Sequence, residues 1–217
     1  MNLLLSRAHH PVTVLGYGRR VGIWTQGCRI RCAGCVSRDT WAADPQAAVD
    51  DTELLDWIRS LPEDEVDGIT ISGGEPFDQP AALEHLLDGL LSWRRQRTRP
   101  ADLLCYSGYP LRRLRARHGP ILNRLDVLIP EPFRAANTTA PPMRGSSNQP
   151  MVLLTPLAEE RYGASFALDV DKVPRLQVEV DNEAIWYIGV PRPGDMDRLQ
   201  ELMERRGVRQ EQVSWRS

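Results

Sequence analysis

A short buried strand that ends in two glycines and a glutamate is predicted by residues 66–76, Val66-Asp67-Gly68-Ile69-Thr70-Ile71-Ser72-Gly73-Gly74-Glu75-Pro76. Glycines at a strand end let another group approach the backbone closely, and bare amides there can bind a carboxylate. Glu75 beside them supplies an acceptor for an ammonium group. The stretch therefore suits the two charged ends of an amino acid, although an ordinary strand-to-helix turn with an exposed glutamate has the same features.

Helices and strands are predicted to alternate on both sides of this strand. Asp50 and Glu53 have the spacing of a helix capping box, and apolar residues at helical period follow them. A second helix follows the strand, with leucines at i, i+3, i+4, i+7 and i+8: Leu83, Leu86, Leu87, Leu90 and Leu91. Further strands are predicted at 21–24, 103–106 and 126–129, with an arginine-rich helix from Pro110. The repetition indicates an α/β fold with parallel strands and right-handed crossovers.

Three cysteines, Cys28, Cys32 and Cys35, share one short segment with C-x3-C-x2-C spacing. Three thiolates on one loop can hold three irons of a [4Fe–4S] cluster, because thiolates are the soft ligands that such clusters take. The fourth iron then has no protein ligand and is free to bind a small molecule. This arrangement indicates chemistry at the metal rather than electron transfer alone.

Zinc and a disulfide are the alternatives to an iron–sulfur site. Structural zinc takes four protein ligands, usually as two closely spaced pairs. Here the only other cysteine is Cys105, which is predicted to be a buried structural thiol, and the histidines are scattered: His9, His10, His85 and His118. A disulfide would leave one of the three clustered cysteines unpaired.

Together the two motifs resemble the radical S-adenosylmethionine superfamily. Within it, the chain is most similar to the activating enzymes of anaerobic ribonucleotide reductase. Four stretches carry the likeness: Trp24-Thr25-Gln26-Gly27-Cys28 with Thr40-Trp41; Ile69-Thr70-Ile71-Ser72-Gly73-Gly74-Glu75-Pro76-Phe77; Tyr106-Ser107-Gly108-Tyr109; and Arg144-Gly145-Ser146-Ser147-Asn148-Gln149.

The resemblance implies an incomplete (β/α) barrel with its active site at the carboxyl ends of the strands. It also implies that Cys28, Cys32 and Cys35 hold the cluster. The cofactor-binding residues that it implies for S-adenosylmethionine are Gly34, Gly73, Gly74, Glu75, Pro76 and Ser107. A flavodoxin or ferredoxin would supply the electron, and the 5′-deoxyadenosyl radical would take a hydrogen atom from a substrate. The expected substrate is a glycyl-radical enzyme; a peptide or nucleoside-like molecule modified directly is the alternative. A third hypothesis is a non-enzymatic module that senses oxygen or binds zinc.

Three departures from the family pattern accompany the likeness. Many members have an aromatic residue just before the last cysteine, where Gly34 is usual for this subgroup, but Val36 stands where an aromatic residue often follows that cysteine. Adenine must therefore be contacted by backbone or from elsewhere. The activating enzymes usually have Asp-Gly where this chain has Pro130-Glu131. The residues after Gln149 are largely lacking in the short activating enzymes.

The chain is expected to consist of a core at 1–150 and an extension at 151–217. Residues 130–150 are rich in Pro, Thr, Ala, Ser and Asn and predict a long loop, with a lid over the active site favoured over a flexible connector. In the extension, strands at 175–180 and 184–189 predict a β-hairpin, and a helix is predicted from Asp195 to about Arg206.

Neither the net charge nor the hydropathy of the chain indicates a polyanionic or membrane partner. The net charge is −2, and no apolar run is long enough to cross a bilayer. Arginines cluster at 94–99 and 112–117, where solvated helix ends are the expected explanation and docking of an acidic surface is the alternative. Free thiols intended for iron need a reducing compartment, so the protein is expected to be cytoplasmic.

Overall fold

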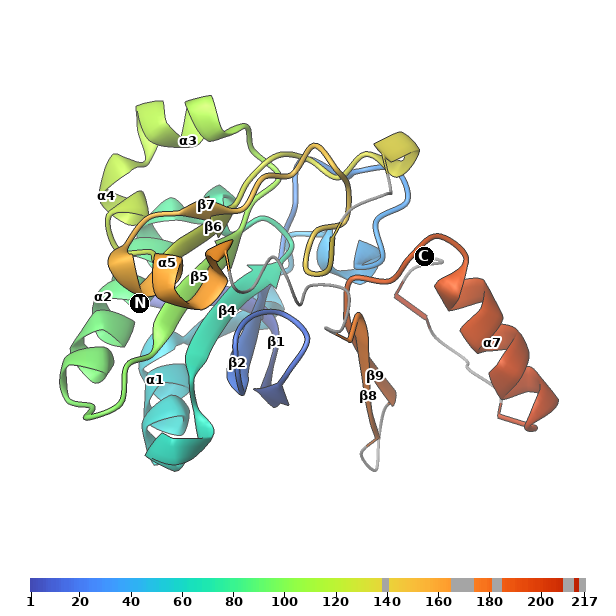
Figure 1. Ribbon diagram of the computed structural model, residues 1–217, viewed down its shortest axis with the longest axis horizontal. Helices are drawn as coiled ribbons and strands as arrows, with labels where there is room; N and C mark the ends of the chain where they lie inside the picture. The colour runs from blue at the N-terminus through green and yellow to red at the C-terminus, as the bar shows by residue number, and fades with distance from the viewer. Residues whose placement is uncertain (138–140, 165–173, 181–184, 209–212, 215–217) are drawn as a thin grey trace.

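A computed structural model describes residues 1–137, 141–164, 174–180, 185–208 and 213–214. Seven strands form one sheet in the order β3-β1-β2-β4-β5-β6-β7, and two more form a hairpin, β8-β9 (Figure 1). The strands are β1 Asn2–Val12, β2 Arg20–Thr25, β3 Ala48–Asp50, β4 Gly68–Gly73, β5 Asp102–Tyr106, β6 Val127–Ile129, β7 Val152–Leu153, β8 Leu176–Val180 and β9 Ile185–Gly189. The predicted mixed α/β fold is confirmed.

The helices that connect and flank the strands are α1 Asp51–Ser60, α2 Pro80–Arg95, α3 Leu111–Arg117, α4 Gly119–Leu122, α5 Pro156–Tyr162 and α7 Asp195–Arg205. Short 3-10 turns lie between them: η1 Arg38–Thr40, η2 Pro45–Ala47, η3 Glu63–Glu65, η4 Pro76–Asp78 and η5 Ala135–Asn137. Asp50 caps α1 as its spacing predicts, although its carboxylate accepts from the Thr52 amide rather than from the third residue of the helix.

Strands β2, β4, β5 and β6 pair in parallel, with β2 and β4 in register from Arg20 and Gly68 to Thr25 and Gly73. The outer strands β3, β1 and β7 pair antiparallel. The register brings the carboxyl ends of the parallel strands to the same edge of the sheet. The cysteine loop follows β2 and Glu75 follows β4, so both motifs leave the sheet at this edge.

The two faces of the sheet bury different side chains because successive residues of a strand point to opposite sides. Leu103 and Cys105 of β5 join the main core with α1 and α2, whereas Leu104 packs on the other face with Tyr162 of α5. The predicted leucine face of α2 is confirmed, since Leu83, Leu86, Leu87 and Leu90 are buried. Figure 1 shows α1 and α2 on one side of the molecule and the hairpin with α7 on the opposite side.

The predicted elements of the extension are confirmed where they are described. β8 and β9 pair antiparallel, and α7 ends next to Gly207, whose φ is 77°. The hairpin turn and Ala184, at which the second strand was predicted to begin, fall within 181–184, outside the described residues. β7 pairs with β6 and so adds the start of the extension to the main sheet.

Three strands were missed by the sequence analysis. β1 contains half-buried residues along almost its whole length, so its sequence has no clear alternation of apolar and polar positions. β3 has three residues and β7 has two, too few for any period. All three are defined by pairing with a neighbouring strand rather than by local pattern.

Candidate active site at the carboxyl ends of the parallel strands

A cavity at the carboxyl ends of β2 and β4 is lined by residues of both motifs. The three half-buried cysteines, Cys28, Cys32 and Cys35, line it together with Glu75. All three thiols are free, as is Cys105, which is fully buried in β5 as predicted. The fold therefore brings the proposed cluster ligands and the proposed ammonium acceptor to one shared space.

The cysteine loop is closed at its base by hydrogen bonds between its two ends. The Gly27 amide donates to the Thr40 carbonyl at 2.8 Å, and the Cys28 amide donates to the Trp41 carbonyl at 3.0 Å. Gln26 is 8 % exposed, and its side-chain amide donates to the carbonyls of Asp39 and Ala42. These contacts explain why Trp24–Cys28 and Thr40–Trp41 belong to one motif: they hold the loop that carries the cysteines.

Positions 73 and 74 require glycine because both pack closely against the start of the cysteine loop. Gly73 has a φ of 102°, and a Cβ there would lie 2.3 Å from the Thr25 nitrogen. A Cβ on Gly74 would lie 2.2 Å from the Gly27 carbonyl oxygen. The Gly74 amide donates to the Thr25 carbonyl and the Glu75 amide to the Gly27 carbonyl. The expectation of bare glycine amides was therefore wrong at Gly74, because its amide, like that of Glu75, joins β4 to the start of the cysteine loop.

Glu75 is 1 % exposed, and its carboxylate is held by three donors of its own chain. Oε1 accepts from the Phe77 amide at 3.0 Å and from Ser107 Oγ at 2.8 Å, and Oε2 accepts from the Gly108 amide at 2.7 Å. A carboxylate has about four acceptor positions, so one remains for an ammonium group. Burial raises the pKa of Glu75 to about 7, against the lowering effect of these hydrogen bonds.

The thiols of Cys28 and Cys32 are also affected by burial, which raises their pKa above the ordinary value. Backbone hydrogen bonds offset part of the rise, and the Ser37 amide donates to Cys35 Sγ at 3.4 Å. Among the described residues, no three His, Cys, Asp or Glu side chains converge on a single metal ion. The three thiols of a cluster loop each bind a different iron, so a cubane does not require such convergence. The donor set fits a cluster.

The remaining predicted site residues lie close to this centre. Gly34, with a φ of 77°, and Ser107 line the cavity. Ser107 Oγ donates to Glu75 and accepts from the Tyr109 amide, so it orients the carboxylate. Pro76 is buried behind the lining, where it begins the η4 turn.

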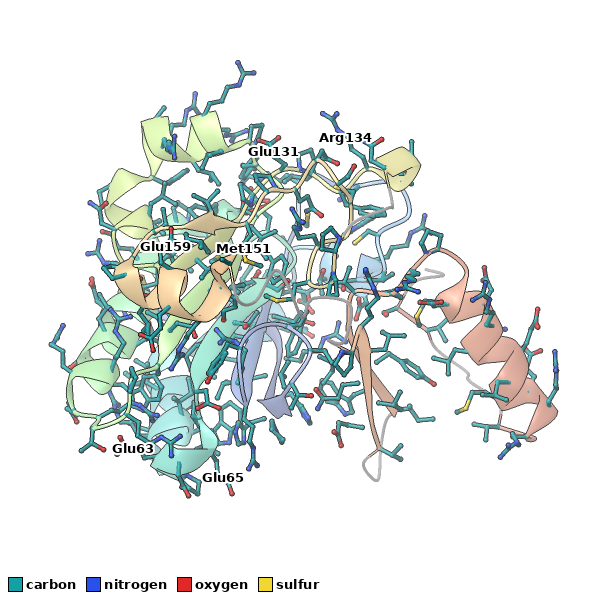
Figure 2. The ribbon with its side chains drawn as sticks, in the orientation of Figure 1. Glu63, Glu65, Glu131, Arg134, Met151 and Glu159 are labelled. Atoms are coloured by element: carbon teal, nitrogen blue, oxygen red, sulfur yellow. The ribbon has the colours of Figure 1, made fainter. Side chains whose placement is uncertain are left out.

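The loop between β6 and β7 forms another part of the wall. Phe133 lines the cavity and lies 3.4 Å from the position of a Cβ on Gly34. Gln149 Oε1 accepts from the Gly145 and Ser146 amides, while Gln149 Nε2 donates to the Glu131 carbonyl at 2.9 Å. The Arg144–Gln149 motif thus ties its own segment to the segment that follows β6. Figure 2 shows Glu131 and Arg134 in this region, far from Glu63 and Glu65.

Sequence reasoning missed the wall residues of the extension and of the loop after β1. Gly189, Val190 and Pro191 line the cavity after β9, and Leu15 lines it from the segment between β1 and β2. None of them carries a chemical group that would single it out. Their only sequence signal is a hairpin, which does not indicate what it packs against.

Comparison with known proteins agrees with this geometry. Residues 14–152 match the family model described as a 4Fe-4S single cluster domain. The chain belongs to this 4Fe-4S single cluster domain family. It is 29 % identical over 136 residues to the anaerobic ribonucleoside-triphosphate reductase-activating protein of Enterobacteria phage T4, covering 63 % of this chain and 85 % of that protein.

Two further relatives match over a shorter segment. The chain is 40 % identical over 82 residues to the pyruvate formate-lyase-activating enzyme of Staphylococcus epidermidis, covering 36 % of this chain and 33 % of the relative. The same enzyme of Staphylococcus aureus (strain USA300) is 40 % identical over 78 residues, and the chain spans 31 % of it. The predicted resemblance to radical S-adenosylmethionine activating enzymes is confirmed. The family model and the named relatives also confirm the prediction of an iron–sulfur enzyme of this type. No helix in the described part of the chain is long and apolar enough to span a membrane.

Proposed function

We propose that the protein reductively cleaves S-adenosylmethionine and installs a glycyl radical on a partner enzyme. The observation that carries the proposal is the shared cavity of the three cysteines and Glu75. Two relatives named as activating proteins or enzymes support the type of partner. The residues 1–150 would form the catalytic core, as an incomplete barrel built on the four parallel strands, and 151–217 an extension packed on it.

In this proposal Cys28, Cys32 and Cys35 hold a [4Fe–4S] cluster. When bound and reduced, the cluster would supply one electron for cleavage of the sulfonium of S-adenosylmethionine to methionine and a 5′-deoxyadenosyl radical, which would take one hydrogen atom from the partner. Glu75 accepts a hydrogen bond from the ammonium group of the substrate through its remaining acceptor position. Ser107 and Gly108 hold that carboxylate in place. Gly34 and the backbone of Gly73 contribute contacts at the cavity wall.

The cavity wall would also limit water at the reacting centre. Ile30 within the cysteine loop and Phe133 beside it are apolar lining residues, and the Arg144–Gln149 motif holds the segment that carries Phe133. A cytoplasmic flavodoxin or ferredoxin is the proposed electron donor. A reducing compartment keeps the three thiols available for iron.

Anaerobic reconstitution followed by reduction with S-adenosylmethionine tests the proposal. About four irons and four sulfides per chain, and formation of 5′-deoxyadenosine, are expected. Electron paramagnetic resonance with a candidate glycyl-radical enzyme should show a carbon-centred doublet on the partner. Release of 5′-deoxyadenosine with a modified peptide or nucleoside, and no radical on a protein, would instead support direct modification of a substrate. Stoichiometric zinc without sulfide would refute both.

A further inference from the structure

The C-terminal extension forms part of the cavity rather than a separate appendage. Gly189, Val190 and Pro191 line the same space as Cys35 and Glu75, although more than a hundred residues of chain separate them. Val190 packs with an apolar cluster that includes Leu15 and Trp24, both of which also line the cavity.

The hairpin that presents Val190 is docked firmly on the core. Ile188 is 3 % exposed and packs with Val12, Val14 and Leu15. Gln177 Nε2 donates to the Pro11 carbonyl at 2.7 Å, and the Thr13 amide donates to Gln177 Oε1 at 2.8 Å. One polar and one apolar anchor thus fix β8 and β9 against the end of β1.

A third anchor lies beyond α7 and contacts the chain just after the last cysteine. Ser214 Oγ donates to the Val36 carbonyl at 2.9 Å, and the Arg38 amide donates to the Ser214 carbonyl at 3.0 Å. Val36 directly follows Cys35. The extension therefore contacts the cavity from the hairpin and holds the chain just after the last cysteine.

The chemistry of the lining indicates what this wall contacts. Glu75, held in place by Ser107 and Gly108, supplies the polar group for the ammonium end of an amino acid. The wall at Val190, Pro191 and Leu15 is apolar and offers contact area to a flat, weakly polar ring. Adenosine is the part of S-adenosylmethionine with that character. We propose that Val190 and Pro191 of the C-terminal extension form the wall that contacts the adenosyl group, an inference that rests on the proposed function.

Binding of S-adenosylmethionine to the cluster-loaded, unreduced protein tests this inference. Val190→Ala removes two methyl groups from the wall and should weaken binding about fivefold to tenfold. Val190→Trp should fill the space and abolish binding. Val180 of the same hairpin is 71 % exposed, so Val180→Ala and Val180→Trp are matched controls and should bind as the parent chain does. Iron content and thermal unfolding confirm that each variant is folded and loaded.

Hydrogen exchange of the unsubstituted protein provides a measurement that needs no variant. Adding S-adenosylmethionine should slow amide exchange in peptides that cover 185–191, and leave peptides covering α7 unchanged. Affinities of both Val190 variants within twofold of the parent, or unchanged exchange at 185–191, would overturn the inference. A loaded parent protein that does not bind S-adenosylmethionine at all would instead refute the proposed function.

Discussion

Glu131 shows how a single residue can carry a backbone conformation that suits glycine. Its φ is 84°, in the left-handed region, at a position where the activating enzymes usually have glycine. Its side chain compensates in part, because Oε1 accepts from the Leu111 amide at the start of α3 at 3.1 Å. Compared with glycine, Glu131 therefore adopts this backbone conformation less easily, but its side chain adds a hydrogen bond to the start of α3.

Two substitutions separate the backbone strain at Glu131 from its hydrogen bond to α3. Glu131→Ala removes the helix contact and keeps the strained backbone, whereas Glu131→Gly removes both. We expect the glycine variant to be more stable than the alanine variant by about 1 kcal/mol. Denaturant unfolding of the apo protein measures the difference, and equal stability of the two variants would contradict the assigned strain.

Glu75 carries the second prediction at this scale. Because its pKa is raised to about 7 by burial, the carboxylate form increases as pH rises through 7. Affinity for S-adenosylmethionine should therefore increase from pH 6 to pH 8. Glu75→Gln should lower the affinity at pH 8 by about tenfold or more, since a charge-assisted hydrogen bond is lost, and should remove the pH dependence above pH 6. A glutamine variant that keeps the slope would assign it to another group.

At the scale of elements, the ends of β2 and β4 position the site. The amides of Gly74 and Glu75 and the missing side chains of the two glycines bring β4 against Thr25–Gly27. The same contact places Glu75 next to the first cysteine. The arginine-rich helix ends are used differently: Arg94 pairs with Asp126 at 2.6 Å, and Arg97 lies 4.5 Å from the Trp93 ring.

Gly73→Ala should disrupt the junction between the two strands. The added methyl would meet the Thr25 backbone, and the φ of 102° is unfavourable for alanine, so loss of several kcal/mol of stability is expected, at least about 3. Cluster incorporation, measured as iron and sulfide per chain, should fall with it. Gly119→Ala is the control, because a Cβ at Gly119 meets nothing within 4 Å. Normal cluster loading of the Gly73 variant would show that the junction tolerates a side chain.

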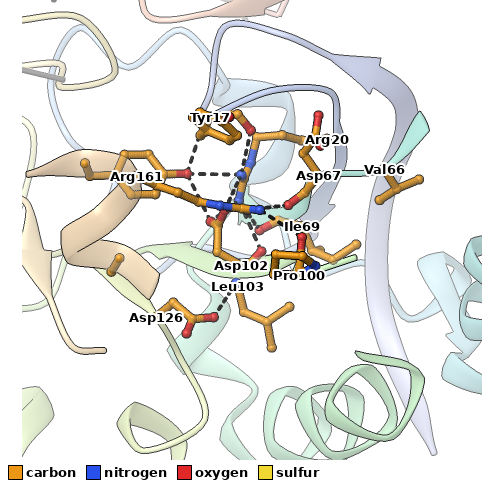
Figure 3. A network of polar contacts seen from close by, with 12 residues as sticks. Tyr17, Arg20, Val66, Asp67, Ile69, Pro100, Asp102, Leu103, Asp126 and Arg161 are labelled. Atoms are coloured by element: carbon orange, nitrogen blue, oxygen red, sulfur yellow. Dashed lines mark hydrogen bonds and ion pairs between the residues drawn. The ribbon is translucent and has the colours of Figure 1, made fainter. Parts of the chain in front are cut away.

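At the scale of the whole molecule, a buried ionic network lies at the opposite ends of the parallel strands. Arg20 and Asp102 are both 0 % exposed, and Arg20 Nη2 lies 2.7 Å from Asp102 Oδ2 (Figure 3). Arg161 and Tyr162 of α5 also bond to Asp102. The network joins β2 and β5, which flank β4 in the sheet, to α5 at the start of the extension.

Breaking this network should destabilise the fold in a pH-dependent way. Burial alone would raise the pKa of Asp102, but Arg20 and Arg161 outweigh it and hold the pKa below its usual value. The stabilisation is therefore present above the unfolded pKa, near 4, and is lost as pH falls through the lower folded pKa. Asp102→Asn should cost about 3 to 5 kcal/mol at pH 7 and flatten the acid limb of the stability curve.

Denaturant unfolding between pH 3 and pH 7 measures both effects. Asp88→Asn is the control, because Asp88 pairs with Arg124 at the surface, where its side chain is 55 % exposed. Its cost should stay within about 1 kcal/mol. A similar loss of unfolding free energy in both variants would show that the buried network stabilises the fold no more than a surface ion pair does.

The sequence by itself determined the features that depend on local pattern and on donor chemistry. The spacing of Cys28, Cys32 and Cys35 predicts the cluster ligands, and the leucine period of α2 and the short strand before Gly73 predict the alternating fold. These signals are local, because the three cysteines share one short segment and a helix period needs only its own residues.

Only the tertiary structure decided which distant segments meet. Three features depend on apolar surfaces and hydrogen bonds between segments far apart in the chain. They are the packing of Val190 at the cavity, the hydrogen bond from Ser214 to Val36, and the addition of β1 and of β7 to the sheet. The amides of Gly74 and Glu75 are occupied for the same reason, since their acceptors belong to the cysteine loop. Such contacts are chosen by the packing of the whole chain, which no short stretch of sequence encodes.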